Sequence, residues 1–164
     1  MKCFVFLFLL LISQGFCLQA QEDTQDYPGD NELKINAAYL LGGFGEITYE
    51  RILGDESAFG ISLGFALDNS IDYRFGVIPF YRLYFGNKRA SVFFVEGNAG
   101  FFSERTFESD TEFGAGLGLA VGSKFITKRN WIAEVFFGLG RNFSSGDGQS
   151  DVYPRLGILI GKRY

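Results

Sequence analysis

The sequence predicts an all-β fold, an eight-stranded antiparallel up-and-down transmembrane β-barrel. From about residue 32 to the end of this 164-residue chain, apolar residues recur at every second position, which is the period of a β-strand. Eight such runs are separated by short clusters of Gly, Asn, Asp, Ser and Lys, which favour turns. Within the runs one face is large and apolar, whereas the other is small or charged. The length favours a single domain.

The N-terminus predicts a secretory signal peptide over residues 1–20. A positive start is followed by the apolar run Cys3–Ile12, which is shorter than the roughly 20 residues of a membrane-spanning helix. Cleavage is expected after Ala20, with Cys17 as the second choice, and either site leaves no cysteine in the mature chain. Residues 21–31, QEDTQDYPGDN, are polar and turn-rich and predict a flexible periplasmic segment.

The barrel is expected to occupy residues 32–164. Its strands are predicted at Glu32–Leu41, Glu46–Leu53, Ala58–Leu67, Tyr73–Phe85, Val92–Phe102, Glu112–Ile126, Trp131–Asn142 and Val152–Tyr164. Most are close to the 9 to 11 residues of a tilted transmembrane strand, and no amphipathic helix is expected after the leader. An even number of strands joined by short links can close on itself, which removes both sheet edges.

The parity of large and small residues indicates which face meets lipid. In the sixth run, EFGAGLGLAVGSKF, large apolar residues alternate with Gly and Ala, and the third run repeats the pattern. A soluble barrel buries its large residues and faces water with polar ones, and a glycine stripe makes a poor solvated surface. The pattern therefore predicts large residues facing lipid and small ones facing a narrow lumen.

Charged side chains at inward positions predict an ion-paired lumen. They are Arg82, Glu96, Lys124, Glu134, Glu50 and Arg155. Closing the hairpin around residues 88 and 89 places Arg82 opposite Glu96, and closing the one around residues 128 to 130 places Lys124 opposite Glu134. We interpret the group as a structural plug, with an ion or proton path as the alternative. Glu134→Ala is expected to strand Lys124 and to cost a few kcal/mol.

Loop lengths and aromatic residues predict the orientation. Three short turns, Gly54–Ser57, Asn87–Ser91 and Thr127–Asn130, are expected on the periplasmic side, and the longer acidic connections Ser103–Thr111 and Phe143–Asp151 outside. Outward aromatic residues are expected to form two interfacial belts. The lower belt is Phe59, Phe85, Phe93, Phe125, Trp131 and Tyr164, and the upper belt is Phe65, Phe75, Phe101 and Phe113.

The C-terminal stretch YPRLGILIGKRY ends in an aromatic residue and is similar to the strand that the outer-membrane assembly machinery recognises. Over residues 32–164 the chain resembles the small outer-membrane barrels of OmpX or OmpA type. It resembles still more a family of bacterial barrels described as a domain of unknown function, through NELKINAAYLL, ITYERIL, PFYRLYFG, FFVEG, VGSKF, AEVFFGLGRN and IGKRY. The resemblance implies the fold, a bacterial outer-membrane location with lipid and lipopolysaccharide around the wall, and recognition of the strand ending in Tyr164. It implies no activity, and the outward Lys162 departs from an all-apolar terminal strand.

Composition narrows the function classes. The chain has 15 basic and 19 acidic residues, an acidic balance that disfavours a nucleic-acid partner. It has no His, the usual base for a serine nucleophile, so we expect no enzyme. The glycine runs fail the dinucleotide-loop spacing at Leu119. Acidic residues at Asp147–Asp151 could contact calcium together with Glu104, Glu108, Asp110 or Glu112, but a solvated loop is favoured, and no cofactor or metal is expected.

Three functions stay open at this point. The first is an outer-membrane barrel with a structural, envelope or surface-interaction role through its acidic loops. The second is a narrow channel or transporter. The third is a secreted soluble barrel that binds a small apolar ligand.

Overall fold

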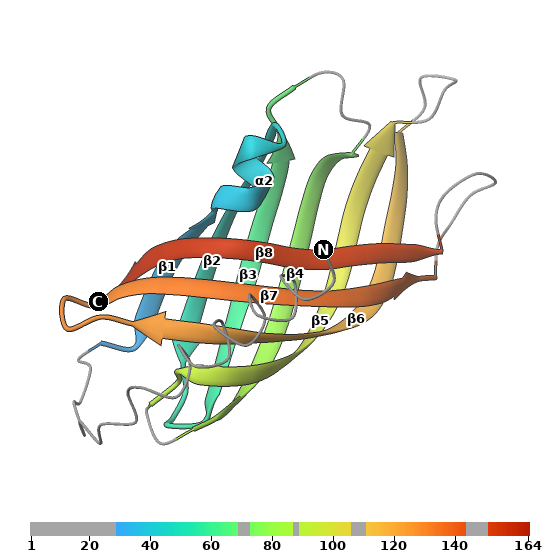
Figure 1. Ribbon diagram of the computed structural model, residues 1–164. Helices are drawn as coiled ribbons and strands as arrows, with labels where there is room; N and C mark the ends of the chain where they lie inside the picture. The colour runs from blue at the N-terminus through green and yellow to red at the C-terminus, as the bar shows by residue number, and fades with distance from the viewer. Residues whose placement is uncertain (1–28, 69–72, 87–88, 106–110, 144–150) are drawn as a thin grey trace, which may run out of the picture.

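A computed structural model describes residues 29–68, 73–86, 89–105, 111–143 and 151–164 of the chain. It confirms the all-β fold: the strands form one closed antiparallel barrel in chain order, and the first strand pairs with the last (Figure 1). The strands are β1 Asn31–Asn36, β2 Phe44–Ile52, β3 Ser57–Ala66, β4 Tyr73–Phe85, β5 Val92–Arg105, β6 Thr111–Ile126, β7 Trp131–Asn142 and β8 Val152–Arg163. Apart from β1, each agrees with its predicted run to within three residues at each end.

The first predicted strand is too long. β1 ends at Asn36, and residues Ala37–Leu41 form the short helix α2 in place of the expected strand end. The sequence AAYLL loses the period-two alternation and is rich in good helix formers. Asn36 caps the helix, because its side chain accepts a hydrogen bond from the backbone N–H of Tyr39 at 3.4 Å. α2 then packs against β2 and β8 at one end of the barrel (Figure 1).

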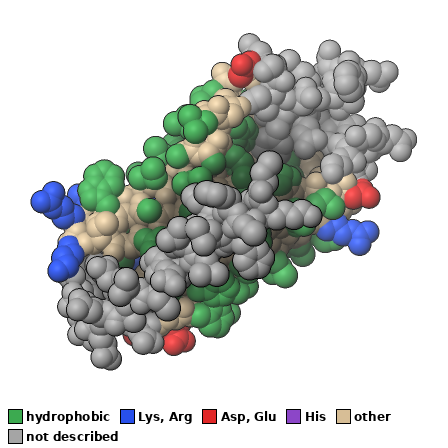
Figure 2. Space-filling model, in the orientation of Figure 1, with side chains coloured by type: hydrophobic (Ala, Val, Ile, Leu, Met, Phe, Trp, Pro, Cys, Tyr) green, Lys and Arg blue, Asp and Glu red, His purple; other side chains and the backbone are tan. Residues whose placement is uncertain are grey.

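The two faces of the wall differ as the parity predicts. Most of the described inward positions are buried, whereas large apolar side chains at outward positions are exposed, for example Leu119 at 68% and Phe137 at 69%. In the space-filling view hydrophobic side chains cover the visible wall between the two ends, and the charged side chains that can be seen gather at the ends (Figure 2). The outer surface is therefore the apolar one.

The inward glycines make room for particular side chains. A Cβ added at Gly60 would lie 2.3 Å from the Phe80 ring, and one added at Gly140 would lie 2.0 Å from the Tyr153 ring. At Gly161 the added atom would meet the Lys34 stem at 2.5 Å. The glycine stripe thus lets aromatic rings, as well as long charged side chains, lie across a narrow lumen.

No helix among the described residues is long and apolar enough to span a membrane. The predicted signal peptide, and residues 147–150 of the acidic connection weighed as a calcium contact, lie outside the residues that the structure describes.

Candidate functional site in the barrel lumen

Among the residues that the structure describes, ten charged side chains lie buried in the lumen, each 4% exposed or less. They are Glu32, Glu46, Glu50, Glu96 and Glu134 on the acidic side and Lys34, Arg82, Lys124, Arg155 and Arg163 on the basic side. Five negative charges thus face five positive ones. This balance matters because a buried charge without a partner costs several kcal/mol. We call these ten residues the lumen charge cluster.

Glu50 is the most connected carboxylate of the cluster. Its oxygens accept from Lys34 Nζ at 2.6 Å, from Arg82 Nη1 at 2.7 Å and from Lys124 Nζ at 2.6 Å. They also accept a hydrogen bond from the Tyr84 hydroxyl. Three basic side chains from three different strands therefore converge on one acid.

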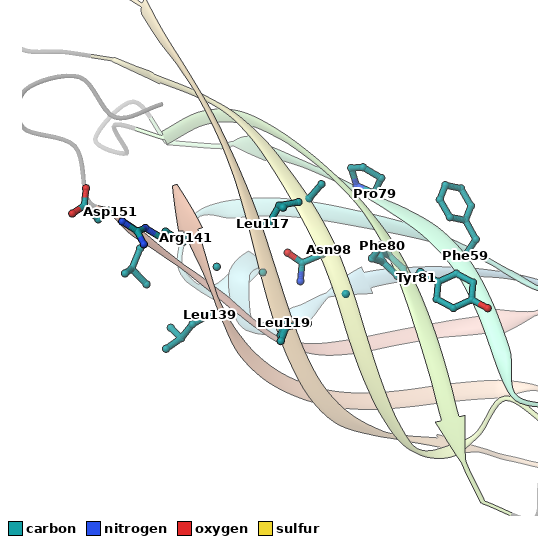
Figure 3. A pocket seen from close by; sticks show the side chains of 15 residues that line it. Phe59, Pro79, Phe80, Tyr81, Asn98, Leu117, Leu119, Leu139, Arg141 and Asp151 are labelled. Atoms are coloured by element: carbon teal, nitrogen blue, oxygen red, sulfur yellow. The ribbon is translucent and has the colours of Figure 1, made fainter. Parts of the chain in front are cut away.

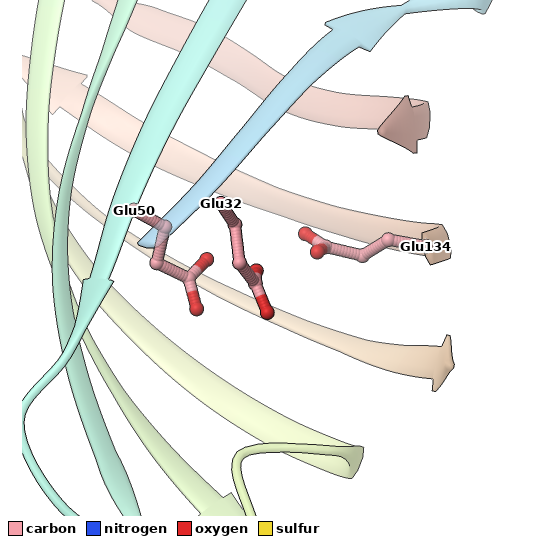
Figure 4. A group of neighbouring side chains, drawn as sticks. All are labelled: Glu32, Glu50 and Glu134. Carbon is pink, nitrogen blue, oxygen red and sulfur yellow. The ribbon is translucent and has the colours of Figure 1, made fainter. Parts of the chain in front are cut away.

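The carboxylates of Glu32, Glu50 and Glu134 lie together, with ligand atoms within 4.8 Å of one another (Figure 4). Such a group of oxygens could hold a hard cation. In this chain the ammonium of Lys34 takes that position, 3.0 Å from Glu32, 2.6 Å from Glu50 and 3.0 Å from Glu134. The protein supplies its own cation.

The two predicted registers are both observed. Arg82 lies opposite Glu96, and Lys124 lies opposite Glu134. Arg82 and Glu96 also form the expected ion pair, with Nη2 2.8 Å from Oε2.

The expected pairing of Lys124 with Glu134 is wrong. Lys124 Nζ instead reaches Glu32 at 2.7 Å and Glu50, across the lumen on β1 and β2. Glu134 contacts Lys34 at 3.0 Å and Arg82 at 2.6 Å. The lumen is narrow enough for a long side chain to cross it, so the facing wall offers Lys124 closer carboxylates than the neighbouring strand does.

This difference predicts the outcome of a double-mutant cycle. Glu134→Gln should couple to Lys34→Met by about 1 to 3 kcal/mol, because the two side chains touch, and more weakly to Lys124→Met, which it meets only through shared partners. The measurement is urea unfolding in lipid vesicles, followed by the fluorescence of the single tryptophan, Trp131. A larger coupling to Lys124 would restore the pairing expected from the hairpin alone.

Arg155 lies nearer the α2 end of the lumen. Its Nε donates to Glu96 at 2.9 Å, its Nη1 to Glu46 at 3.3 Å and its Nη2 to the Ser62 hydroxyl at 3.1 Å. Glu46 in turn accepts from Asn36 Nδ2 at 2.9 Å. The sequence predicts that Arg155 points inward but assigns it no partner. In the structure it bonds to side chains on β2, β3 and β5.

Aromatic rings pack against the basic side chains of the lumen charge cluster. The Arg82 guanidinium lies 4.2 Å from the Phe94 ring centroid and 4.5 Å from that of Phe80. Arg155 lies 4.7 Å from the Phe136 centroid. Cations over ring faces gain further stabilisation where water is excluded. Rings and ion pairs together fill the lumen at this level.

Four members of the cluster were not among the predicted site residues. Glu32 and Lys34 are on β1, Glu46 is on β2 and Arg163 is on β8. Parity alone could have found them, since Glu32 and Lys34 alternate with outward apolar residues in NELKIN, and Arg163 shares the parity of Arg155. Arg163 donates to Glu32 at 2.6 Å and to the carbonyl of Ala90 at 3.0 Å, at the end opposite α2.

A cavity of about 510 Å³ lies in the lumen at the α2 end. Its walls come from α2, β2, β3, β4, β5, β7 and β8. They are mostly apolar, with Phe44, Ile78, Phe102 and Pro154, and they carry the polar groups of Tyr39, Glu46, Asn142 and Tyr153. We call this space the upper lumen cavity.

A shallower groove of about 1000 Å³ crosses the outer wall over β3 to β7 (Figure 3). Outward side chains such as Tyr81, Leu117 and Leu119 line it, and Gly97, beside which an added Cβ would meet nothing within 4 Å, leaves it open. Pro79 also lines the groove, at a point where the pairing of β4 with β5 is interrupted between Val77 and Phe80. Proline has no N–H to donate to the neighbouring strand. This groove belongs to the apolar outer wall.

The residues predicted for the two aromatic belts all point outward. Each is exposed by 39% to 76%; they are Phe59, Phe85, Phe93, Phe125, Trp131, Tyr164, Phe65, Phe75, Phe101 and Phe113. They stand near the strand ends, apart from the lumen charge cluster, and contribute only to the outer surface.

Searches of family models, curated proteins and solved structures find no match to this chain. The class of protein is therefore defined by the fold and the lumen alone. It is a closed eight-stranded antiparallel β-barrel with an apolar outer wall and a charge-balanced interior.

Proposed function

We propose that this protein is an integral barrel of the bacterial outer membrane, exported by a signal peptide, with a structural or surface-interaction role and no catalytic activity. Its wall would contact lipid and lipopolysaccharide, and its connections at the α2 end would face outward. The OmpX-like resemblance and the recognition of the terminal strand by the assembly machinery belong to the same proposal.

The observation that carries the proposal is the polarity of the two faces of the barrel, which is the reverse of that in a soluble protein. Large apolar side chains cover the outside, whereas ten charges lie inside. Soluble monomers rarely expose large contiguous apolar surfaces, and a lipid-embedded barrel has an apolar outer band and a polar interior. β2 to β8 each have 9 residues or more, which suits a bilayer of ordinary thickness.

The same reversal of polarity disfavours a secreted soluble barrel with an apolar ligand at its centre, because the centre of this lumen is ionic. A channel is disfavoured because the basic side chains of the lumen are held in ion pairs. Arg82, Lys34 and Lys124 are each held by two or more carboxylates and are not exposed. Side chains held in this way leave no open path for an ion at that level.

Membrane fractionation combined with an unheated gel tests the location. In a Gram-negative host the chain is expected in the outer-membrane fraction, requiring detergent for extraction, and the folded barrel should migrate differently before and after boiling. Recovery in the soluble periplasm, or identical migration in both states, would contradict the proposal.

The extracted protein also separates the plug from the channel when it is reconstituted into planar bilayers. A plugged lumen should give no defined single-channel steps, and a general porin run in parallel confirms that insertion is detected. Reproducible steps that change with Arg82→Gln would favour the channel instead.

A further inference from the structure

The upper lumen cavity lies beside the lumen charge cluster, and Glu46 is the one cluster member that lines it. At about 510 Å³ it falls within the usual range for small-molecule sites. Phe44, Ile78 and Phe102 supply apolar wall. The inward residues Gly64 and Gly76 also line it, and the Phe44 ring lies over Gly64, where an added Cβ would come within 2.6 Å of that ring.

One polar group of this cavity has its hydrogen-bonding capacity unused. Asn142 is 8% exposed, and its Oδ1 is buried without a hydrogen-bond partner in the described part of the chain. A buried acceptor left without a hydrogen-bond donor is destabilising. A ligand that donates a hydrogen bond to it would remove that cost.

The remaining polar lining is Glu46, Tyr39 and Tyr153. Glu46 contributes a carboxylate, and the Tyr153 hydroxyl already donates a hydrogen bond to Asn98 Oδ1 at 2.7 Å. None of the described residues that line the cavity is basic. Arg155 beneath Glu46 is 1% exposed and already bonded to three side chains. The lining therefore offers an anion no positive charge and places the Glu46 carboxylate beside it.

Charge balance decides between a cation and a neutral donor. The five buried acids are matched by five buried bases, and a cationic ligand would leave one positive charge in excess inside the barrel. We propose that the upper lumen cavity is a binding site for a small neutral amphiphile, with an aromatic or aliphatic body and a head group that donates a hydrogen bond to Asn142.

Three probes of one shape test this in NMR titrations of the labelled barrel in dodecylphosphocholine micelles: 1-aminoanthracene, anthracene and anthracene-1-carboxylate. The amine should bind saturably and about fivefold more tightly than the hydrocarbon, which is the worth of one hydrogen bond. The carboxylate should bind more weakly than both. Shifts should concentrate at lining residues such as Gly42, Gly64 and Phe102.

Two tryptophan variants in α2 distinguish binding of a probe in the cavity from its partition into the micelle. Ala38 lines the cavity, whereas Leu41 on the same helix is 92% exposed and does not. Ala38→Trp should abolish the saturable shifts, and Leu41→Trp should leave them unchanged. Both substitutions lie in α2, outside the strands, and migration of the unheated protein checks that each variant has folded.

Asn142→Leu, which keeps the branched shape of the side chain and removes the acceptor, should reduce the preference for amine over hydrocarbon to within about twofold. Three outcomes overturn the proposal. One is binding of the carboxylate as tight as that of the amine. Another is an amine preference that survives Asn142→Leu. The third is a set of shifts at outer-wall residues such as Gly97 and Leu117 that persists in Ala38→Trp. The three-probe comparison uses the unmodified barrel and so does not depend on the folding of any variant.

Discussion

Replacing Glu50 with glutamine should lower the free energy of unfolding by about 3 to 5 kcal/mol, the cost of removing one partner from a buried ion network. The substitution keeps the size of the side chain but leaves five buried bases against four acids. Lys34, Arg82 and Lys124 all lose a contact shorter than 2.8 Å. Urea unfolding in lipid vesicles, followed by Trp131 fluorescence, measures the effect.

A second substitution tests whether charge balance is the cause. Adding Lys124→Met to Glu50→Gln restores equal numbers of buried acids and bases, and it should recover at least half of the lost stability. The matched control is Glu56→Gln in the exposed turn between β2 and β3, which should change stability by less than about 0.5 kcal/mol. A double variant no more stable than Glu50→Gln alone would show that the hydrogen bonds of Glu50, and not its charge, are what matter.

Gly138→Ala should destabilise the barrel by about 1 to 3 kcal/mol through overpacking. A Cβ at this inward position of β7 would lie 2.1 Å from the backbone oxygen of Leu119 and 2.5 Å from the Cα of Ala120. Both atoms belong to the backbone of the neighbouring strand, so no side-chain rotation can relieve the contact. The same unfolding measurement applies.

Gly97→Ala is the matched control on β5. An added Cβ there meets nothing within 4 Å, and the position faces outward. This variant should be neutral or more stable by about 0.5 to 1 kcal/mol, since alanine loses less backbone freedom on folding than glycine does. Equal destabilisation by the two substitutions would contradict the role given to the inward glycine stripe.

The lumen shows how far parity reasoning extends. The registers of Arg82 with Glu96 and of Lys124 with Glu134 follow from short turns, because a tight hairpin sets which residues oppose each other. Arg82 and Glu96 form the ion pair that their register predicts. Lys124 instead pairs with Glu32 and Glu50. Whether a charged side chain meets its cross-strand neighbour depends on what the opposite wall presents, and hairpin register does not contain that information.

The sequence pattern predicted neither helix α2 nor the upper lumen cavity. The AAYLL stretch is apolar enough to be read as the end of a strand, and its helix propensity is joined by docking on β2 and β8, which the sequence pattern does not contain. The cavity depends on how rings from several strands, Phe44 and Phe102 among them, lie beside the inward glycines. The Oδ1 of Asn142, which has no hydrogen-bond partner in the described part of the chain, is visible only once those strands are placed around it.

By itself, the sequence determined the number of strands, their order, the face that points outward and the hairpin registers. These depend on residues a few positions apart, for which alternation and turn chemistry are sufficient. The tertiary structure decided which of the ten buried charges touch, where the first strand ends and where space is left inside. Those outcomes depend on closure of β1 against β8, which brings residues such as Lys34 and Glu134, a hundred positions apart, to within bonding distance across one narrow lumen.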